Sequence, residues 1–543
     1  MVALAGCAQG SSVPQAAPPQ QAEGLERAKS LDCTPGKEYY LSKDPPKRGG
    51  IFQKTGASAN LDPTVGSGVV VGQMGQVYDT LLEQRSCFFE DIDVIPSLVK
   101  SWSVSADGKV WNMKLRDDVK WHNKPPVNGR KFTSADVAWT IDYQKKGAVL
   151  KTYWQDVNYT TPDANSIIMT LAQPRADFVY QLSLTQNVIV PREVYEQYGD
   201  FKTVAIGTGA FMMKHNIPNQ ISVQERNPDY YDMGRDGKPL PYVDGIENHG
   251  LADRTATEAA FLAGQLDVGG PETKDDADRW QKTMPKAQRG GGVRGTLHAL
   301  FFNMSVKPWD DVKLRKAIAP GIVRDDILLG SRKGSFAESG FIPGAFPNFM
   351  WSVDKLHEKF KADPELSKKL LAEAGYGPGT VKVVMKTTGQ YAQDAEVVQN
   401  HLQKIGINST ISVETPQAGG GGASIILNRG DYDIMWGVPI PSTFPDYWAY
   451  DIIRGGTATN IPRINDPKIN ELADAQRVEL DVSKRKVLID QIQERMYELM
   501  PFVPVMSTVT YSFYNCRVRN AAPDMPNSSV RYAVGLWLDS TGC

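Results

Sequence analysis

The sequence predicts an α/β protein with two or three lobes. Strand patterns alternate with capped helix patterns along the chain, an order typical of sheets covered by helices. The chain has 543 residues, which is more than a single hydrophobic core organises, so we expect the globular part to divide. We find no repeat at a fixed period.

A strand is predicted over residues 109–115. Every second residue in it is apolar, which is the period of a half-buried sheet: Trp111, Met113 and Leu115. Asp107-Gly108, just before the strand, has the composition of a hairpin turn.

Helices are predicted where a cap precedes an apolar stripe. A helix over 133–147 opens with a capping box completed by Asp136, and one over 255–264 opens with a box completed by Glu258.

Two further helices follow in the second half of the chain. The helix over 363–375 has Asp363 as its N-cap and Pro364 as its first residue, and it stops at Gly375. The helix over 394–405 carries four apolar residues on one face, as a core-facing helix does: Val397, Val398, Leu402 and Ile405.

The composition is that of an ordinary soluble protein, with 41% hydrophobic and 22% charged residues, a net charge of -2 and a pI near 6.4. A nucleic-acid binder usually shows a basic stripe, and binding to anionic membranes needs a similar Lys/Arg cluster. The sequence has neither, and no apolar run approaches the roughly 20 residues that span a bilayer. We therefore expect no nucleic-acid partner.

Motifs for catalysis and metal binding are incomplete. His357-Glu358 begins the pattern of a zinc protease, but Lys361 stands where the second histidine belongs. Ser97 and Lys100 form an S-x-x-K without its companion motifs. We therefore expect no catalytic residues, no cofactor and no metal site, and we predict that the protein is not an enzyme.

Glycine-rich runs occur at 290–295 and 419–422. Neither has the lysine and hydroxyl residue of a phosphate loop, so we expect flexible surface loops. Gly207 and Gly209 precede a strand pattern rather than a helix, so they do not form a dinucleotide-binding fingerprint.

The N-terminus carries a lipobox-like tetrapeptide that ends at Cys7. Small residues before a cysteine suit a lipoprotein signal peptidase, which predicts a residual signal over 1–7 and a lipid on Cys7. Residues 8–43 then form a tether and N-terminal extension. The alternative is a chance match in a polar terminus, because most of a signal sequence is missing before Cys7.

Four cysteines remain when Cys7 is set aside: Cys33, Cys87, Cys516 and Cys543. An even number suits disulfides in an oxidising compartment, although four cysteines can pair in three ways that the sequence does not rank. We favour bonds that tie the two termini together. The alternative is four reduced, buried thiols.

A series of phrases follows a fixed order between about residues 48 and 520. They are GGIFQKTGASANLDPTVG, PSLVKSWSVSADGKVWNMKLRDDVKWHNKPPVNGRKFTSADVAWTI, GTGAFMMKHNIPNQISVQERNPDYY, FLAGQLDVG, LFFNMSVKPWDDVKLRKAI, KLLAEAGYGPG, LQKIGINSTI and GDYDIMWG. In this order the phrases resemble the bacterial extracellular solute-binding proteins of family 5, the peptide, oligopeptide and nickel type. Members of that family are substrate-binding components of ABC importers.

The resemblance implies the two-lobed periplasmic-binding-protein fold, with a ligand cleft between the lobes and an extra subdomain in the first lobe. We expect the first lobe over 44–297, the second over 298–507, and a C-terminal segment over 508–543 that returns to the first. The chain then crosses between the lobes near 297–303 and 501–507, through two short parallel hinge strands. Closure of the lobes over a ligand would create the form that the membrane permease recognises.

In relatives, the loop after the first strand and the segment after DYDI contact the ligand from opposite lobes. Here these are 60–68 and 436–447, and the second is rich in aromatic residues, which suits a partly apolar organic solute. The residues implied to bind ligand are Asn60, Ser67, Trp436, Thr443, Phe444, Asp446 and Tyr447. The alternative for each aromatic residue is packing in the core or between the lobes.

The chain departs from its relatives in two places. Peptide-binding relatives often carry an aspartate that pairs with the amino terminus of the ligand, but this chain has Ser442-Thr443-Phe444 there, and only Asp446, in a shifted register, could take that role. An uncharged or anionic solute is therefore as well supported as a peptide. Pro320-Gly321 interrupts a stretch that is helical in relatives, and we expect a break there.

We therefore predict a substrate-binding lipoprotein of an ABC importer that captures a peptide or another small organic solute, partly aromatic compounds included, and delivers it to a membrane permease. We expect a lipid-anchored monomer in the periplasm or on the outer face of the cytoplasmic membrane. The alternative is a sensor lipoprotein that binds a ligand but does not deliver it to an importer. Neighbouring permease and ATPase genes would separate these two functions.

Overall fold

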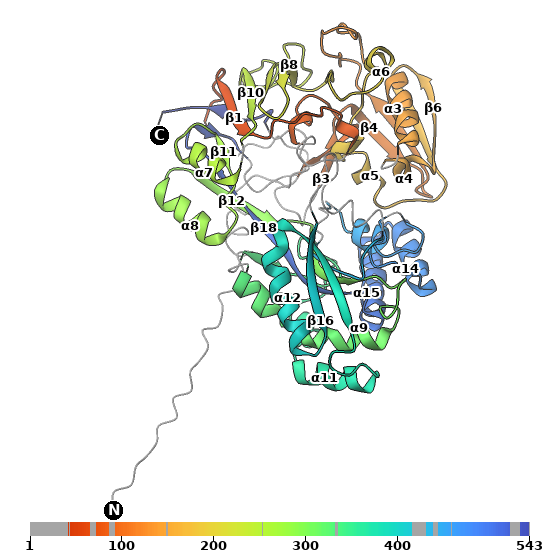
Figure 1. Cartoon of the computed structure of the whole chain (residues 1–543). Helices are drawn as coiled ribbons and strands as arrows, with labels where there is room; N and C mark the ends of the chain where they lie inside the picture. Colours follow the sequence, from red (N-terminus) through yellow and green to blue (C-terminus); the bar gives the residue numbers. More distant parts are fainter. Residues whose placement is uncertain are drawn as a thin grey trace, which may run out of the picture.

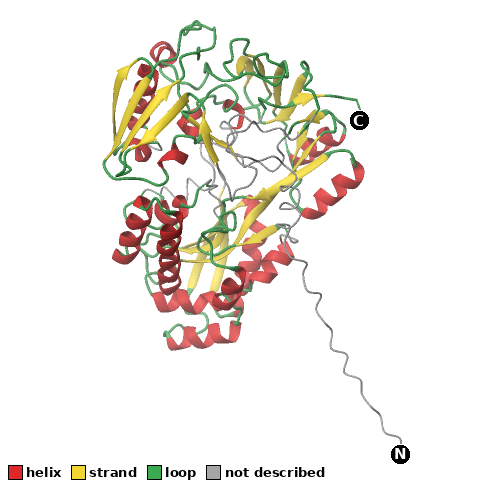
Figure 2. Ribbon diagram, turned by 180° about the vertical axis from the view of Figure 1, so that it is seen from behind, coloured by secondary structure: helices red, strands yellow, loops and turns green. Residues whose placement is uncertain are grey.

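The chain folds into two lobes joined by long strands (Figure 1). Strands dominate the first lobe, whereas helices surround the sheet of the second (Figure 2). Among the residues given below, no helix is long and apolar enough to cross a lipid bilayer. The structure, a computed structural model, describes residues 42, 44–65, 72–85, 93–147, 150–251, 253–331, 335–414, 430–437, 442, 444–457, 459–521, 533–541 and 543.

One sheet of the first lobe has the strand order β1-β10-β9-β8. Strand β1 is parallel to β10, and the other pairs are antiparallel. The C-terminal segment completes the core of this sheet, where the rings of Tyr242 and Trp537 lie 5.8 Å apart. The strands are β1 (Ile51–Thr55), β8 (Phe211–Ile217), β9 (Ile221–Arg226) and β10 (Gly245–His249), and the C-terminal pair is β19 (Val518–Arg519) and β20 (Trp537–Leu538).

A second, antiparallel sheet of the first lobe has the order β4-β5-β7-β6. Its inner face buries Trp111, Met113 and Leu115, so the predicted strand over 109–115 is confirmed as β5 (Val110–Leu115). Gly108, at φ 71°, forms the turn from β4, also as predicted. The other elements are β4 (Val99–Val104), β6 (Val157–Asp163), β7 (Ser166–Leu171), α3 (Ser134–Lys146), α4 (Lys151–Trp154), α5 (Phe178–Gln181), α6 (Arg192–Tyr198), η1 (Pro63–Val65), η3 (Thr185–Asn187), β2 (Leu82–Arg85) and β3 (Asp93–Pro96).

The largest sheet has the order β11-β18-β13-β17-β15-β16, with β12 and β14 also paired to β18. Strands β15, β16 and β17 are parallel to one another, whereas β13 and β18 run antiparallel to their neighbours. The strands are β11 (Val268–Gly269), β12 (Gln288–Val293), β13 (His298–Phe302), β14 (Phe336–Glu338), β15 (Lys382–Thr388), β16 (Asn408–Glu414), β17 (Ile434–Trp436) and β18 (Phe502–Tyr514).

Helices cover the second lobe, and its apolar core runs from Leu297 to Met506. Separate apolar clusters lie in the first lobe. The remaining helices are α7 (Arg254–Leu262), α8 (Lys274–Thr283), α9 (Val312–Ile318), η4 (Ala319–Gly321), η5 (Asp326–Ser331), α10 (Val353–Lys359), α11 (Pro364–Glu373), η6 (Gly389–Tyr391), α12 (Ala392–Lys404), η7 (Tyr447–Asp451), α14 (Pro467–Val478) and α15 (Val482–Leu499).

Most predicted helix ends are confirmed. The capping box of Thr133 and Asp136 opens α3. Asp363 accepts a hydrogen bond from the backbone N–H of Leu366 at 2.8 Å and so caps α11, while α12 buries Val398 and Leu402 on its core face. These caps and stripes depend on residues close in sequence, which is why the sequence alone predicts them.

The predicted cap of α7 is wrong. Asp253 caps this helix by accepting from the backbone N–H of Ala256 at 2.9 Å. Glu258 instead pairs with Arg279 of α8 at 2.6 Å, so it does not complete a capping box. Aspartate is a strong N-cap, and the helix therefore begins earlier than a box based on Thr255 predicts.

The break predicted at Pro320-Gly321 is confirmed. Helix α9 ends at Ile318 and continues as the single 3-10 turn η4. A Cβ atom on Gly321 would lie 2.8 Å from the side chain of Ile405, so the close packing against the end of α12 also requires glycine there.

The two crossing segments are paired with each other, and they are antiparallel rather than parallel as predicted. Val293 of β12 pairs with Val509 of β18, and His298 of β13 pairs with Met506. Between these two pairs, the chain from β12 to β13 has four residues and β18 has two. The two extra residues form a bulge at the crossing. Because β18 returns toward the first lobe as β13 leaves it, the antiparallel arrangement follows from the chain direction.

The glycine run at 290–295 is not a flexible loop as predicted. Its first part belongs to β12, where a Cβ atom on Gly291 would lie 2.1 Å from the carbonyl oxygen of Thr510. Glycine is needed for this close approach to β18. The second run, 419–422, lies outside the described residues.

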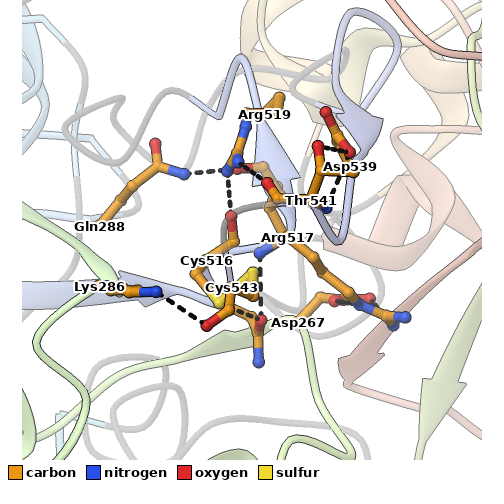
Figure 3. The surroundings of a disulfide bond; sticks show 11 residues. Asp267, Lys286, Gln288, Cys516, Arg517, Arg519, Asp539, Thr541 and Cys543 are labelled. Carbon is orange, nitrogen blue, oxygen red and sulfur yellow. Dashed lines mark hydrogen bonds and ion pairs between the residues drawn. A yellow bond between two sulfur atoms is a disulfide. The ribbon is translucent and has the colours of Figure 1, made fainter.

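A disulfide joins Cys516 to Cys543 beside the pair β19–β20 (Figure 3). Their Cα atoms are 5.5 Å apart, and the carbonyl oxygen of Cys543 accepts a hydrogen bond from Lys286 Nζ at 3.1 Å. The bond lies within the C-terminal segment, so for these two cysteines the pairing between the termini is wrong: the hairpin brings them together locally. Cys7, Cys33 and Cys87 lie outside the described residues.

We expect protein from an oxidising compartment to show no free thiol at Cys516 or Cys543. An alkylating reagent added under denaturing conditions should leave both unlabelled, and prior reduction should label both, as read by peptide mass spectrometry. Labelling of either cysteine without reductant would contradict the disulfide.

Candidate functional site

The predicted ligand-binding residues of the first lobe lie in the loop after β1. Asn60 is half-buried in a turn, where its Oδ1 accepts from the backbone N–H of Asp62 at 2.9 Å and its own N–H donates to Ser58 Oγ at 3.2 Å. Among the described residues, no hydrogen bond or ion pair joins Asn60 to the segment that begins at Trp436. Ser67 lies outside the described part of the chain, as does Thr443.

Trp436 ends β17 between β13 and β15. The side chain is fully buried in the core of the second lobe. Its carbonyl oxygen accepts from Thr387 Oγ1 at 3.1 Å, but its indole Nε1 has no hydrogen-bond partner among the residues described. A buried N–H without a partner is rare and costly, so this group stands out among the polar atoms of the second lobe.

Phe444 forms a contact between the lobes. Its ring is 4% exposed and stacks on Tyr180 of α5, with ring centroids 6.2 Å apart and planes at 12°. Ser442 holds the backbone nearby, because its Oγ accepts from the N–H of Phe444 at 3.3 Å. In the described conformation Phe444 therefore packs across the two lobes.

Asp446 is committed to an ion pair inside the second lobe. Its buried carboxylate accepts from the guanidinium of Arg485, which is also buried, and from Gln476 Nε2 at 3.2 Å. Tyr447, which follows, is half-buried at the start of η7, and its ring meets that of Trp448 edge-on at 5.7 Å. Burial raises the pKa of Tyr447 well above its ordinary value, as do the nearby Asp451 and Tyr153.

A second contact between the lobes joins the segment before α5 to the end of α14. The N–H of Ala176 donates to the carbonyl oxygen of Arg477 at 2.8 Å, and the guanidinium of Arg477 lies 3.8 Å from the carboxylate of Asp177. Asp177 also pairs with Arg175 at 3.1 Å. Burial alone raises the pKa of Asp177, but the two arginines outweigh it and hold that pKa at about 2.

Asp451, on η7, faces the same charged contact. Burial raises its pKa to about 6, and the charge of Asp177 adds to the increase, while Arg477 and Arg175 oppose it. Tyr153 and Tyr447 also lie near this carboxyl group, and the pKa of each is raised in turn. The carboxyl group of Asp451 therefore titrates far closer to neutral pH than that of Asp177.

We expect the Asp451 carboxyl group to add to the stability of the folded state on mild acidification. Its folded pKa lies above the unfolded value of about 3.9, so the folded chain binds more protons and stability rises as the pH falls through 6 toward 4. The gain should be on the order of 1 kcal/mol between about pH 7 and pH 5. Burial lowers the pKa of His122 to about 4, so this histidine acts in the opposite direction over the same pH range. The gain is therefore read as a difference: in urea unfolding at both pH values, the wild type should gain about 1 kcal/mol relative to Asp451→Asn.

The low pKa of Asp177 acts in a different pH range. Its contribution to stability is complete above the unfolded pKa and is lost only as the pH falls below about 4 toward 2. If the stabilities of the wild type and Asp451→Asn change by the same amount between pH 7 and pH 5, the assignment to Asp451 is contradicted.

A further group of polar residues lies where the chain crosses between the lobes. Nε2 of His298 is 2.7 Å from Thr508 Oγ1, and the His298 ring meets Tyr391 edge-on with centroids 4.9 Å apart. Tyr391 also packs against Gly437, where an added Cβ atom would lie 3.1 Å from its ring. Arg294 lies next to Tyr391 and completes the group.

This crossing lies at the carboxyl ends of parallel strands. Strand β15 ends at Thr388, and β17 ends at Trp436, immediately before the segment that reaches Phe444. In open α/β sheets, ligands bind outside the carboxyl ends of the strands, where loops diverge. The crossing and the segment from Trp436 to Tyr447 therefore form the candidate ligand-binding site.

Sequence reasoning missed Arg294, His298, Thr388 and Tyr391 as members of this site. One signal was present, because Arg294 is a charged residue just before the strand predicted to cross between the lobes. Tyr391 carries no such signal, since its place depends on how η6 packs against β17. No group of three or more His, Cys, Asp or Glu side chains in the described part of the chain is placed to hold a metal ion.

Comparisons with known proteins identify the family of the chain. The profile of the bacterial extracellular solute-binding proteins, family 5 middle region, matches residues 93–460. A probable ABC transporter-binding protein of Deinococcus radiodurans is 23% identical over 499 residues, covering 78% of this chain and 81% of the relative. The di/tripeptide-binding protein 1 of Pseudomonas aeruginosa is 24% identical over 516 residues, covering 85% and 89%.

Solved structures share the fold. The PBP AgaA of A. tumefaciens R10, in complex with agropinic acid, has a TM-score of 0.77 at 24% identity, covering 90% of this chain and 99% of AgaA. The periplasmic protein DppA of Helicobacter pylori, in complex with the peptide STSA, has a TM-score of 0.77 at 21% identity, covering 91% and 99%. The profile match spans most of both lobes, and the chain belongs to the bacterial extracellular solute-binding proteins of family 5, which serve ABC transporters.

Proposed function

We propose that this protein captures one small organic solute between its lobes, closes over it and delivers it to an ABC permease. The observation that carries the proposal is the antiparallel pair of crossing segments, bulged at 294–297. It lies at the end of the sheet where the Thr388 hydroxyl and the Trp436 indole N–H are buried without a hydrogen-bond partner among the described residues. Two paired strands with a local irregularity suit a hinge, because rotation there moves each lobe as a unit.

The contacts between the lobes support closure. Tyr180 stacks on Phe444, and the Ala176–Arg477 hydrogen bond and the Asp177–Arg477 ion pair lie between the same two lobes. Such contacts form only when the lobes approach, so they contribute to the closed state. A ligand then shifts the equilibrium by binding the closed state better than the open one.

We propose lobe boundaries at 44–297 and 298–507, with 508–543 returning to the first lobe. The apolar core that runs from Leu297 to Met506 supports the second lobe. The contact of Trp537 with Tyr242 supports the return of the C-terminal segment. We also propose a monomer anchored by lipid on Cys7, in the periplasm or on the outer face of the cytoplasmic membrane, with no catalytic step of its own.

The solute is proposed to be a peptide or a partly aromatic organic compound. The aromatic residues from Trp436 to Tyr450 support apolar contact with it, and the named relatives include binders of di- and tripeptides. Trp436 and Phe444, with Asn60, Ser67, Thr443 and Tyr447, remain the proposed contacts. The ion pair with Arg485 leaves Asp446 at most an orienting role.

Native mass spectrometry of protein purified from its host, followed by a thermal-shift screen of peptides, amino acids, aromatic acids and sugars, tests the proposal. We expect one bound small molecule per chain and a higher melting temperature with its class, because a ligand of the native state must stabilise it. Bound ligand should also stimulate ATP hydrolysis by the reconstituted permease. Binding without stimulation would favour a sensor, and no binding at all would overturn the proposal.

A further inference from the structure

Arg294 occupies the crossing between the lobes, between β12 and β13. Its backbone N–H donates to the carbonyl oxygen of Thr508 on β18 at 2.8 Å, so both crossing segments fix its position. The side chain is half-buried. Arg294 therefore carries a positive charge at the crossing between the lobes.

The guanidinium of Arg294 has no hydrogen-bond or ion-pair partner among the described residues. Burial lowers its pKa below the ordinary value of arginine, and the phenol of Tyr391 offsets this only in part. Arginine nevertheless remains charged in proteins. A partly buried charge without a counter-charge is unfavourable, so the site is poised for an anion.

Three buried arginines have partners within the chain. Arg175 pairs with Asp177, and Arg485 pairs with Asp446. Arg315 instead donates to three backbone carbonyls, those of Trp309, Leu499 and Met500. Arg294 differs from these residues in having neither a carboxylate nor a carbonyl partner, which argues for a partner from outside the chain.

Further hydrogen-bond donors lie at the same end of the sheet as Arg294. Tyr391 lies beside it, and Tyr391 packs on Gly437, the residue after Trp436. The indole Nε1 of Trp436 and the hydroxyl of Thr388 are buried, and neither has a hydrogen-bond partner among the described residues. We name Arg294, Thr388, Tyr391 and Trp436 the donor cluster; it brings donors to the carboxyl ends of β15 and β17.

Nearby carboxylates do not supply the missing counter-charge. Asp446 is the only acidic residue between Trp436 and Tyr447, and the buried Arg485 already neutralises it. Asp394, in the first turn of α12 after Tyr391, has interactions of its own. The local balance of charge at the donor cluster is therefore positive.

We infer that the solute is an organic carboxylate whose carboxylate group is held by Arg294 in the donor cluster, and that a free amino group on the solute is not required. The inference rests on the proposed solute-binding function and narrows its substrate class. A guanidinium presents paired N–H donors that match the two oxygens of a carboxylate, whereas the amide of the same compound offers one oxygen and no charge. Because Asp446 is occupied, an amine has no free carboxylate in this segment.

The test compares acids with their amides. N-acetylated dipeptides and aromatic carboxylic acids, each with its primary amide, are titrated by calorimetry into the wild type, Arg294→Gln, Arg294→Lys and Arg289→Gln. Arg289 is the matched control, since it lies on β12, the strand that leads to Arg294, but pairs with Asp278 at 2.6 Å. We expect an acid that binds the wild type to lose about 100-fold in affinity as its amide, and about 100-fold in Arg294→Gln.

The two controls separate loss of binding from loss of fold. Arg289→Gln should bind the acid as the wild type does, Arg294→Lys should keep part of the affinity, and Arg294→Gln should melt at or above the wild-type temperature because it removes an unpaired charge. Equal affinity for acid and amide, or unchanged acid affinity in Arg294→Gln, would overturn the inference about Arg294 but not the proposed solute-binding function. The solute-binding function itself is contradicted if none of the tested compounds binds, charged or neutral, and if no molecule released from the purified protein binds either.

Discussion

Asp446→Asn should lower the free energy of unfolding by about 3–5 kcal/mol. The substitution removes the charge of a buried carboxylate and leaves the guanidinium of Arg485 buried without its counter-ion. The cost comes from the stranded charge more than from the lost hydrogen bonds. Urea unfolding monitored by tryptophan fluorescence would measure it, with the wild type unfolded under the same conditions.

Asp474→Asn is the matched control for this prediction. Asp474 pairs with Arg454 at 2.6 Å but is 50% exposed, and exposed pairs contribute at most about 1 kcal/mol. We expect the control to remain close to wild type. An Asp446→Asn variant that is as stable as the control, yet no longer binds an amine-bearing solute, would show instead that Asp446 contacts the ligand.

Gly295→Ala should destabilise the protein by about 3 kcal/mol and weaken solute binding. A Cβ atom on Gly295 would lie 1.9 Å from the carbonyl oxygen of Ser442, which is backbone and has little room to move. The carbonyl oxygen of Gly295 also accepts from the N–H of Ser442 at 3.1 Å and from Trp448 Nε1 at 3.1 Å. The methyl group would thus separate the crossing from one wall of the candidate site.

Gly330→Ala is the control for added volume. Nothing lies within 4 Å of a Cβ atom there, so the variant should unfold at or slightly above the wild-type urea concentration. Thermal melts and calorimetry with the identified solute would compare the two variants. If Gly295→Ala matches Gly330→Ala in both stability and affinity, the close approach of the crossing to Ser442 does not exist in solution.

Local sequence signals predicted much of the fold. Strand β5, the caps of α3 and α11 and the break at Pro320 each depend on a few neighbouring residues, and all four are confirmed. The cap of α7 was misplaced because two acceptors compete within three residues, and Asp253 outcompetes Thr255.

Features set by distant parts of the chain could not be predicted in the same way. The glycine run at 290–295 has the composition of a loop, but it forms a strand because β18 lies against it. The Cys516–Cys543 bond depends on the pairing of β19 with β20, which no cysteine spacing reveals.

The candidate site was predicted in outline from the resemblance to family 5. The segment from Trp436 to Tyr447 does lie at the crossing. Its single carboxylate, however, forms an ion pair with Arg485, which is more than thirty residues further along the chain. The donor cluster around Arg294 depends on tertiary packing of Tyr391 against Gly437. Such groups are found only when burial and partners are known for each polar atom.

Small-angle X-ray scattering during titration with the co-purified solute tests the central claim most directly, because capture by lobe closure changes the size of the particle. The account predicts that the radius of gyration of the wild type falls and reaches a plateau at one solute per chain. In Gly295→Ala the radius of gyration should fall less. A radius of gyration that stays unchanged at saturating solute would contradict the account.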